Sequence, residues 1–135
     1  MLAAGNASAA SRVLDLVSEG RGEFSGVDLR DGDLAGDDLS NTTWEDADLS
    51  HADLTAADLS GAMLVDADLT SARLRGACLA MAALEGARLA EVDGAGVIGL
   101  ADAFCSPSTT LPRGWHCQNG QPVLIGELDG DGDDE

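Results

Sequence analysis

Residues 47–61 read ADLSH-ADLTA-ADLSG, three consecutive pentapeptides of one pattern. Each unit begins with Ala and Asp and carries Leu at its centre, which we label position i. The period continues in both directions, and position i−2 is Ala in nine consecutive units, from Ala47 to Ala87. Every fifth residue from 24 to 89 is large and apolar: Phe24, Leu29, Leu34, Leu39, Trp44, Leu49, Leu54, Leu59, Leu64, Leu69, Leu74, Leu79, Leu84 and Leu89.

A period of five fits neither a single α-helix nor a flat strand. Successive leucines would lie about 140° apart around a helix, and they would alternate between the two faces of a strand. They share one side if the chain is extended from i−2 to i, with i−1 pointing outward, and then turns at i+1 and i+2. Each pentapeptide then forms one side of a coil, whose interior is filled by Ala and Leu.

Units such as Ala47-Asp48-Leu49-Ser50-His51 and Ala67-Asp68-Leu69-Thr70-Ser71 resemble those of the pentapeptide repeat family. The resemblance implies four pentapeptides per coil, and therefore an all-β fold, a right-handed quadrilateral β-helix of about 3.5 to 4.5 coils. It favours a non-catalytic module that acts as a protein-interaction or structural scaffold.

The ends of a β-helix expose unpaired backbone and need covers. Ser11 and Gly20 are suitable caps for a short helix over residues 11–20, within an N-terminal segment of residues 1–21. The β-helix is expected over 22–100, and an irregular C-terminal cap over 101–126, ending in a short strand at 123–125. Residues 127–135 are almost entirely Asp, Glu and Gly and are expected to form an acidic disordered tail.

Two features of the first coils stand apart from the repeat. Asp37 occupies an inward position, where a carboxylate needs backbone N–H partners or a distorted corner. Phe24 and Trp44 are twenty residues apart, so a four-sided coil places them on the same face, where we expect them to pack together.

Acidic residues dominate the outward i−1 positions of a chain whose net charge is −18. Such a surface repels nucleic acid and anionic membranes. On a square coil the aspartates form columns, which either keep the protein soluble or imitate the DNA backbone. If the columns imitate DNA, the resemblance to family members that protect DNA gyrase implies a type II topoisomerase as the partner. The columns are Asp28, Asp48 and Asp68 on one side, Asp33 and Asp53 on the next, and Asp38 and Asp58 on the third.

A candidate protein-binding surface lies in the second half of the repeat, where outward positions become apolar. It suits self-association or a protein partner, since Met side chains adapt to varied surfaces. The alternative is that these residues pack under the C-terminal cap. The surface comprises Met63, Val65, Ala80, Met81 and Ala83.

Three cysteines leave several arrangements open. Cys105 and Cys117 flank a turn-rich segment and are candidates for a disulfide, or for buried thiols. With His116, and with Cys78 or His51, they could form a zinc set, but His116 and Cys117 are adjacent and lack the usual ligand spacing.

The sequence contains little that indicates catalysis or a bound cofactor. No third residue accompanies a Cys and His pair, so we expect no enzyme activity and no cofactor. A second alternative function is calcium binding by the tail, where Asp129, Asp131 and Asp133 alternate with other residues.

The N-terminal residues lack the basic and apolar regions of a signal peptide, and no segment approaches membrane-spanning length. A cytoplasmic protein is therefore expected.

Overall fold

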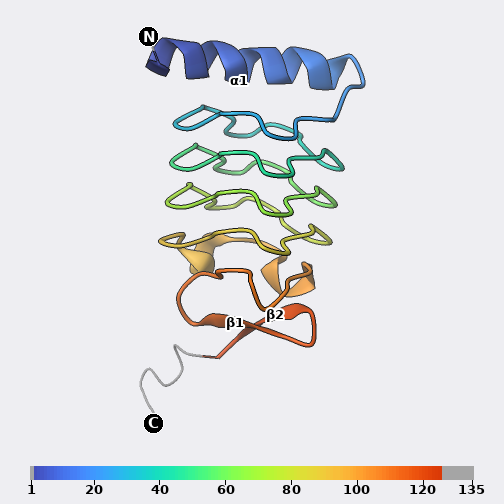
Figure 1. Cartoon of the computed structure of the whole chain (residues 1–135), viewed down its shortest axis with the longest axis vertical. Coiled ribbons are helices and arrows are strands. Elements are labelled where there is room, and N and C mark those ends of the chain that lie inside the picture. The colour runs from blue at the N-terminus through green and yellow to red at the C-terminus, as the bar shows by residue number, and fades with distance from the viewer. Residues whose placement is uncertain (1, 126–135) are drawn as a thin grey trace.

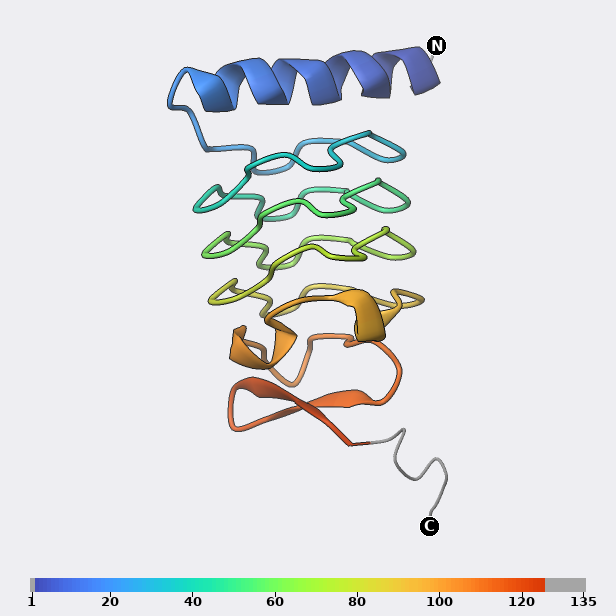
Figure 2. The same ribbon diagram turned by 180° about the vertical axis from the view of Figure 1, so that it is seen from behind.

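Stacked coils form the body of the molecule, with a helix across one end and a hairpin across the other (Figure 1). The computed structural model describes the backbone of residues 2–125 and the side chains from residue 10 onward, so the predicted tail at 127–135 lies outside the described residues. A view from behind shows the same order of layers (Figure 2). The elements are α1 (Leu2–Ser18), the 3₁₀ helices η1 (Gly94–Gly96) and η2 (Leu100–Asp102), and strands β1 (Trp115–Gln118) and β2 (Gln121–Leu124).

Parallel bridges join each repeat coil to the next. Most link residues twenty positions apart, as in Asp28 with Asp48 and Asp48 with Asp68. Twenty residues hold four pentapeptides, so each of these coils has four sides. The total of about 3.5 to 4.5 coils stays a prediction.

Backbone hydrogen bonds run between coils and across each corner. The N–H of Leu49 donates to the carbonyl of Asp68 in the next coil at 2.7 Å, and the N–H of Asp48 donates to Val27 in the preceding coil at 2.8 Å. At the corner, the N–H of Ala52 donates to the carbonyl of Leu49 at 3.1 Å. Short sides and tight turns thus satisfy the backbone without long strands.

Every corner places its i+2 residue in the left-handed region. This holds from Gly26, with φ of 75°, through Ala56, with φ of 60°, to Glu91, with φ of 64°. Glycine adopts this conformation freely, whereas a residue such as Ala56 or Met81 does so at a cost of about 1–2 kcal/mol. The coil therefore fixes the corner geometry even where the sequence does not favour it.

The core is the central column of leucines, closed in by small residues. All fourteen central residues are buried, and most of the leucines have no exposed surface. The alanines at i−2 from Ala47 to Ala87 are also buried, and they leave room for the neighbouring Leu. Interior and exterior thus follow the five-residue register.

Phe24 and Trp44 stack on successive coils, as predicted. Their ring centroids are 4.8 Å apart with an interplanar angle of 29°. The indole N–H of Trp44 donates to Oγ1 of Thr42 at 2.7 Å, which satisfies the polar atom of a fully buried ring.

The N-terminal cap is longer than predicted. α1 spans Leu2–Ser18, so the expected start at Ser11 is wrong. Five of the residues before Ser11 are alanines, which have the highest helix propensity and extend the helix. The helix lies across the first coil, with Ala10 and Val13 buried (Figure 1). The chain leaves it through Gly20, whose φ is 86°.

The last coil is irregular and extends past the boundary expected at residue 100. Ile98 still bridges Cys78 at the regular spacing, but Phe104 bridges Ala83 and Thr110 bridges Arg88. The spacing grows by one residue between Ile98 and Phe104, where η2 lies, and by another between Phe104 and Thr110. The predicted division between repeat and cap therefore falls inside the last coil.

The C-terminal cap contains a hairpin, whereas we expected one short strand at 123–125. β1 and β2 pair in antiparallel register, with Trp115 opposite Leu124. Their turn is Asn119-Gly120, with φ of 54° and 82°. The second strand begins at Gln121 because this two-residue turn returns the chain at once.

Outward aspartates stabilise the sides of the coil through local hydrogen bonds. Oδ1 of Asp38 accepts from the N–H of Ser40 at 3.1 Å and from its hydroxyl at 2.7 Å. The hydrogen bond from the Ser40 side chain, followed by that from its N–H, lowers the pKa of Asp38. The same arrangement recurs at Asp48, Asp58 and Asp68, so the repeat aspartate is also a structural residue.

The inward carboxylate of Asp37 lacks the hydrogen bonds that the outward carboxylate of Asp38 accepts. Its side chain is half-buried, and among residues 10–125 it has no backbone N–H partner, so the first of our two alternatives for this carboxylate is not met. Burial, and then repulsion from Asp33, raises the pKa of Asp37. The inward carboxylate thus destabilises the first coil when it is ionised.

The buried leucine column predicts a large effect of truncation. Leu59→Ala should lower the free energy of unfolding by about 2–5 kcal/mol, because a fully buried side chain is lost and leaves a cavity. Leu124→Ala, at a side chain that is 45% exposed, is the control and should cost less than about 1 kcal/mol. Urea denaturation followed by circular dichroism measures both, and equal losses would contradict the buried column.

Replacement of the two neighbouring aspartates, Asp37 and Asp38, should shift the melting temperature in opposite directions. Asp38 has a lowered pKa in the folded protein. Its ionised carboxylate therefore stabilises the fold at pH values above the pKa that it has in the unfolded chain, and this stabilisation is lost as pH falls. Asp37 has a raised pKa, so its penalty is present at neutral pH and disappears as pH falls. At pH 7, Asp38→Asn should therefore lower the melting temperature and Asp37→Asn should raise it.

The pH dependence separates this charge effect from a change in packing. Both shifts should shrink as pH falls. The shift of Asp37→Asn should shrink at the higher pH, because the pKa of Asp37 is raised, and that of Asp38→Asn only at lower pH, because the pKa of Asp38 is lowered. Shifts of the same sign, or shifts that persist in acid, would be inconsistent with these assignments. Thermal unfolding at several pH values provides the measurement.

Candidate functional site

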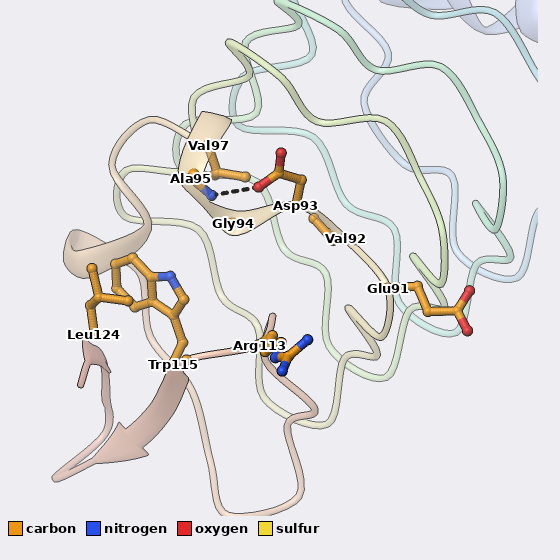
Figure 3. A pocket seen from close by; sticks show the side chains of 10 residues that line it. Glu91, Val92, Asp93, Gly94, Ala95, Val97, Arg113, Trp115 and Leu124 are labelled. Atoms are coloured by element: carbon orange, nitrogen blue, oxygen red, sulfur yellow. Dashed lines mark hydrogen bonds between the residues drawn. The ribbon is translucent and has the colours of Figure 1, made fainter. Parts of the chain in front are cut away.

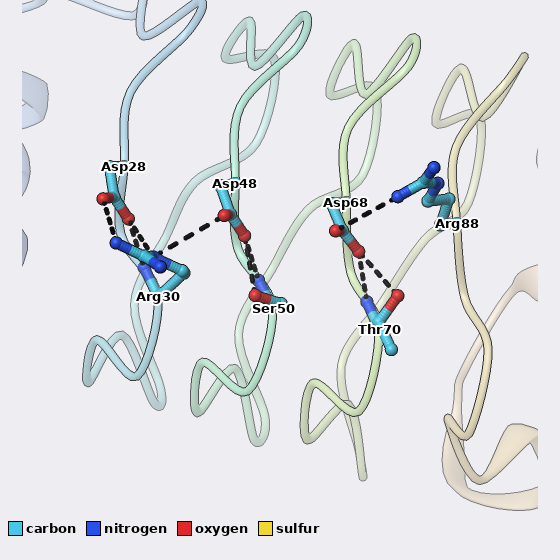
Figure 4. Close-up of polar contacts among 7 residues, drawn as sticks. All are labelled: Asp28, Arg30, Asp48, Ser50, Asp68, Thr70 and Arg88. Carbon is cyan, nitrogen blue, oxygen red and sulfur yellow. Dashed lines mark hydrogen bonds and ion pairs between the residues drawn. The ribbon is translucent and has the colours of Figure 1, made fainter.

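The outward aspartates lie in vertical columns on three sides of the coil. Bridges stack Asp28, Asp48 and Asp68 in one column, and the next residue in that column is Arg88 (Figure 4). Asp53 follows Asp33 and is followed by Arg73, while Asp58 follows Asp38 and is followed by Cys78. The acidic columns are therefore restricted to the first coils.

Arginines partly neutralise these columns. A guanidinium nitrogen of Arg30 lies 2.8 Å from Oδ2 of Asp28, and its Nε lies 3.6 Å from Oδ2 of Asp48 (Figure 4). Arg88 pairs with Asp68 at 3.6 Å, and Arg73 with Asp53 at 3.8 Å. These exposed pairs contribute little stability, but they reduce the negative potential at both ends of the Asp28 column.

The pKa values of three column carboxylates, Asp28, Asp53 and Asp68, are lowered, which keeps these groups ionised at neutral pH. The hydrogen bond from Arg30 is the main cause that lowers the pKa of Asp28. Burial alone would raise the pKa of Asp68, but hydrogen bonds from Thr70 and the charge of Arg88 lower it overall. Hydrogen bonds from Thr55 likewise lower the pKa of Asp53.

Exposed apolar side chains gather around one edge of the coil in its second half. Met63 and Phe104 lie on either side of Ala83 in one bridged column, and Ile98 bridges Cys78 on the adjacent side. Met81 is the i+2 residue of the corner between these two sides, with φ of 62°. We call Met63, Met81, Ile98 and Phe104 the apolar corner.

The predicted contact surface and the apolar corner overlap only in part. Met63 and Met81 are exposed, whereas Val65, Ala80 and Ala83 are half-buried. Ile98 and Phe104 were missed because they lie beyond Leu89, the last central leucine of the repeat. Ile98 keeps the regular spacing, but Phe104 is displaced from it by one inserted residue.

A pocket of about 1000 Å³ lies between the last coil and the hairpin (Figure 3). One wall comes from the segment around η1 and the other from β1, β2 and the residues before them. Sequence reasoning did not predict it, because its walls meet only once the hairpin is placed. It is lined by Glu91, Val92, Asp93, Gly94, Ala95, Val97, Arg113, Gly114, Trp115 and Leu124.

The structure joins Cys105 and Cys117 in a disulfide, with their Cα atoms 5.9 Å apart. The bond connects the last coil to β1. Cys78 is a half-buried free cysteine. Among the described residues, no three His, Cys, Asp or Glu side chains are grouped as a metal site would require, so the zinc set that we considered is not assembled.

The tail residues Asp129, Asp131 and Asp133 lie outside the described residues, so calcium binding there stays a prediction. Within the part of the chain that the structure describes, no helix is long and apolar enough to cross a membrane.

Comparisons with known proteins agree with the coil geometry. The family model for pentapeptide repeats matches in eight copies, over residues 23–61, 38–70 and 52–90. No curated protein sequence matches the chain.

The chain is also similar to solved structures. A pentapeptide repeat protein from Nostoc PCC 7120 is 31% identical, with a TM-score of 0.55, over 78% of this chain and 87% of its own. A pentapeptide repeat protein from the cyanobacterium Cyanothece 51142 is 30% identical, with a TM-score of 0.36, over 65% and 63%. The fluoroquinolone resistance protein QnrB1 is 16% identical, with a TM-score of 0.48, over 66% and 53%. From the family model and the Nostoc structure together, the chain belongs to the pentapeptide repeat family, whose fold is a right-handed β-helix.

Proposed function

We propose that the protein is a non-catalytic scaffold that binds another protein chain through its apolar corner. The single observation that carries this proposal is the exposure of large apolar side chains in a molecule whose other columns are acidic. Pentapeptide repeat proteins are generally structural or interaction modules, which supports the same class.

The apolar corner has the size and composition of a contact surface. Met81 is 60% exposed and Ile98 is 56% exposed, and Met63 and Phe104 extend the surface along the next side. Isolated exposed apolar residues need no explanation, but adjacent ones on two bridged columns form a continuous patch. The C-terminal cap leaves these side chains exposed, so packing beneath it does not account for them.

Met81 adds a second argument. A large residue with φ of 62° is strained, and glycine occupies the equivalent corner position one coil earlier, at Gly61. The Met side chain at this corner gains nothing from burial within the described residues, because it is the most exposed of the large apolar residues. A contact with another chain would bury it and offset the strain.

The charge distribution is consistent with a coil in which one part binds a partner and the other part keeps the assembly soluble. Aspartates fill the columns of the first coils, where they keep an assembly soluble. The apolar corner lies in the second half, on the side where Met63 and Ala83 follow Glu23 and Thr43 in their column. One part of the coil would thus bind while the other remains solvated.

Self-association through the apolar corner gives a direct test. The wild-type protein should form dimers or larger species in sedimentation velocity experiments as its concentration rises. A variant carrying Met63→Ser, Met81→Ser and Ile98→Ser should remain monomeric with an unchanged melting temperature, because these side chains are exposed. Leu124→Ser, at an exposed apolar residue outside the apolar corner, is the control and should leave association unchanged.

A wild-type protein that stays monomeric at high concentration would contradict self-association, and would leave a different protein as the partner. A triple variant that unfolds would show instead that the side chains are structural.

A second candidate function is binding to DNA gyrase by imitation of DNA. The ionised columns favour it, since Asp28, Asp48 and Asp68 repeat along one side as phosphates do along a strand. Length opposes it, because coils about 4.8 Å apart give a β-helix of roughly 15 to 22 Å, against about 34 Å for one turn of duplex. We therefore place this function second.

A supercoiling assay tests this candidate. Inhibition of gyrase should appear at low salt and fade as salt rises, because the contact would join opposite charges. Neutralising the column with Asp28→Asn, Asp48→Asn and Asp68→Asn should abolish it. The matched control changes three corner aspartates to Asn, at Asp31, Asp46 and Asp66, and should retain inhibition. No inhibition by a large excess of wild-type protein would eliminate the candidate.

A further inference from the structure

We infer that the pocket between the last coil and the hairpin binds a small aromatic carboxylate. The site is separate from the apolar corner, and the inference does not depend on the proposed scaffold function. Its volume of about 1000 Å³ is at the upper end of the range for small-molecule pockets.

The walls of the pocket are apolar. Trp115 and Leu124 on the hairpin face the η1 segment with Ala95 and Val97 (Figure 3). Trp115 is half-buried, so part of its indole remains available to a ligand. Aromatic rings stack favourably on such a surface.

Gly94 fixes the position of the indole. A Cβ at residue 94 would lie 2.9 Å from Nε1 of Trp115 and 2.9 Å from Cβ of Pro112, closer than side chains allow. The absence of a side chain therefore lets the hairpin pack against the last coil at this depth. The aromatic wall is thus held in place before any ligand binds.

The charged side chains that line the pocket are not equally available. Oδ1 of Asp93 accepts from the N–H of Ala95 at 3.1 Å, and Oε1 of Glu91 accepts from the hydroxyl of Ser71 at 2.7 Å. Within residues 10–125, Arg113 has neither an ion-pair nor a hydrogen-bond partner, and it is exposed at the pocket beside Trp115 (Figure 3). Arg113 is therefore the one positively charged side chain among the lining residues, and it is the group that an anionic ligand would engage.

These groups select one ligand chemistry. A guanidinium presents a planar pair of donors that matches a carboxylate, and the apolar walls match an aromatic body. The nearby carboxylates of Glu91 and Asp93 repel anions, and they repel a doubly charged phosphate more than a singly charged carboxylate. An aromatic acid with a single negative charge matches the guanidinium and the apolar walls, and it is repelled less by the two carboxylates than a phosphate is.

The test uses three ligands of one shape that differ in charge: 2-naphthoate, neutral 2-naphthamide and 2-naphthylmethylammonium. Binding to the full chain is followed by the two indole N–H resonances in NMR spectra. The Trp115 resonance should shift on titration, whereas that of Trp44, which is fully buried in the repeat core, should not. A dissociation constant on the order of 1 mM is expected for naphthoate, since ligands of this size gain limited affinity.

Arg113→Gln should weaken naphthoate binding by about tenfold or more, the usual effect of losing a charged hydrogen-bond donor, and should leave naphthamide binding unchanged. Arg12→Gln, which removes an exposed arginine from α1 at the other end of the molecule, is the matched control and should change neither. Melting temperatures confirm that both variants fold.

Three results would overturn the inference. The first is no shift of the Trp115 resonance with naphthoate at about ten times the expected dissociation constant. The second is equal affinity for naphthoate and naphthamide, and the third is tighter binding of the ammonium ligand.

Discussion

The burial of one large apolar side chain in every five residues is the constraint on which this structure depends. A leucine can return to the interior at that interval only if the chain turns at each i+2 residue, and the coil does so even at Ala56 and Met81, where positive φ is costly. Hydrogen bonds between coils, such as that from Leu49 to Asp68, then hold successive leucines in one column. The columns of outward residues follow from the same register.

The sequence predicted the repeat region well because a single geometric rule governs it. The buried leucines, the Phe24 and Trp44 stack and the placement of Asp28, Asp48 and Asp68 all follow from the five-residue period. The ends follow no such rule. The hairpin was missed although Asn119-Gly120 is a strong turn signal, and the start of α1 was misplaced because alanines before Ser11 continue the helix.

The candidate surfaces show the same contrast between regular and irregular parts. Met63 and Met81 could be predicted because they stand in the repeat, whereas Ile98 and Phe104 lie beyond its last central leucine, and Phe104 is also displaced by an inserted residue. The pocket depends on contacts between Gly94 and Trp115, which are far apart in sequence. A repeat that binds through its irregular end can vary its partner or ligand while the leucine column is retained.

The register between coils is the central claim, and NMR couplings across hydrogen bonds test it most directly. In a uniformly labelled sample, the amide nitrogens of Leu49, Leu54 and Leu59 should couple to the carbonyl carbons of Asp68, Arg73 and Cys78, each nineteen residues later. That result would establish four sides per coil and one common leucine column. Couplings to residues one pentapeptide nearer or farther would contradict the account, because the columns of aspartates and the apolar corner would then no longer form.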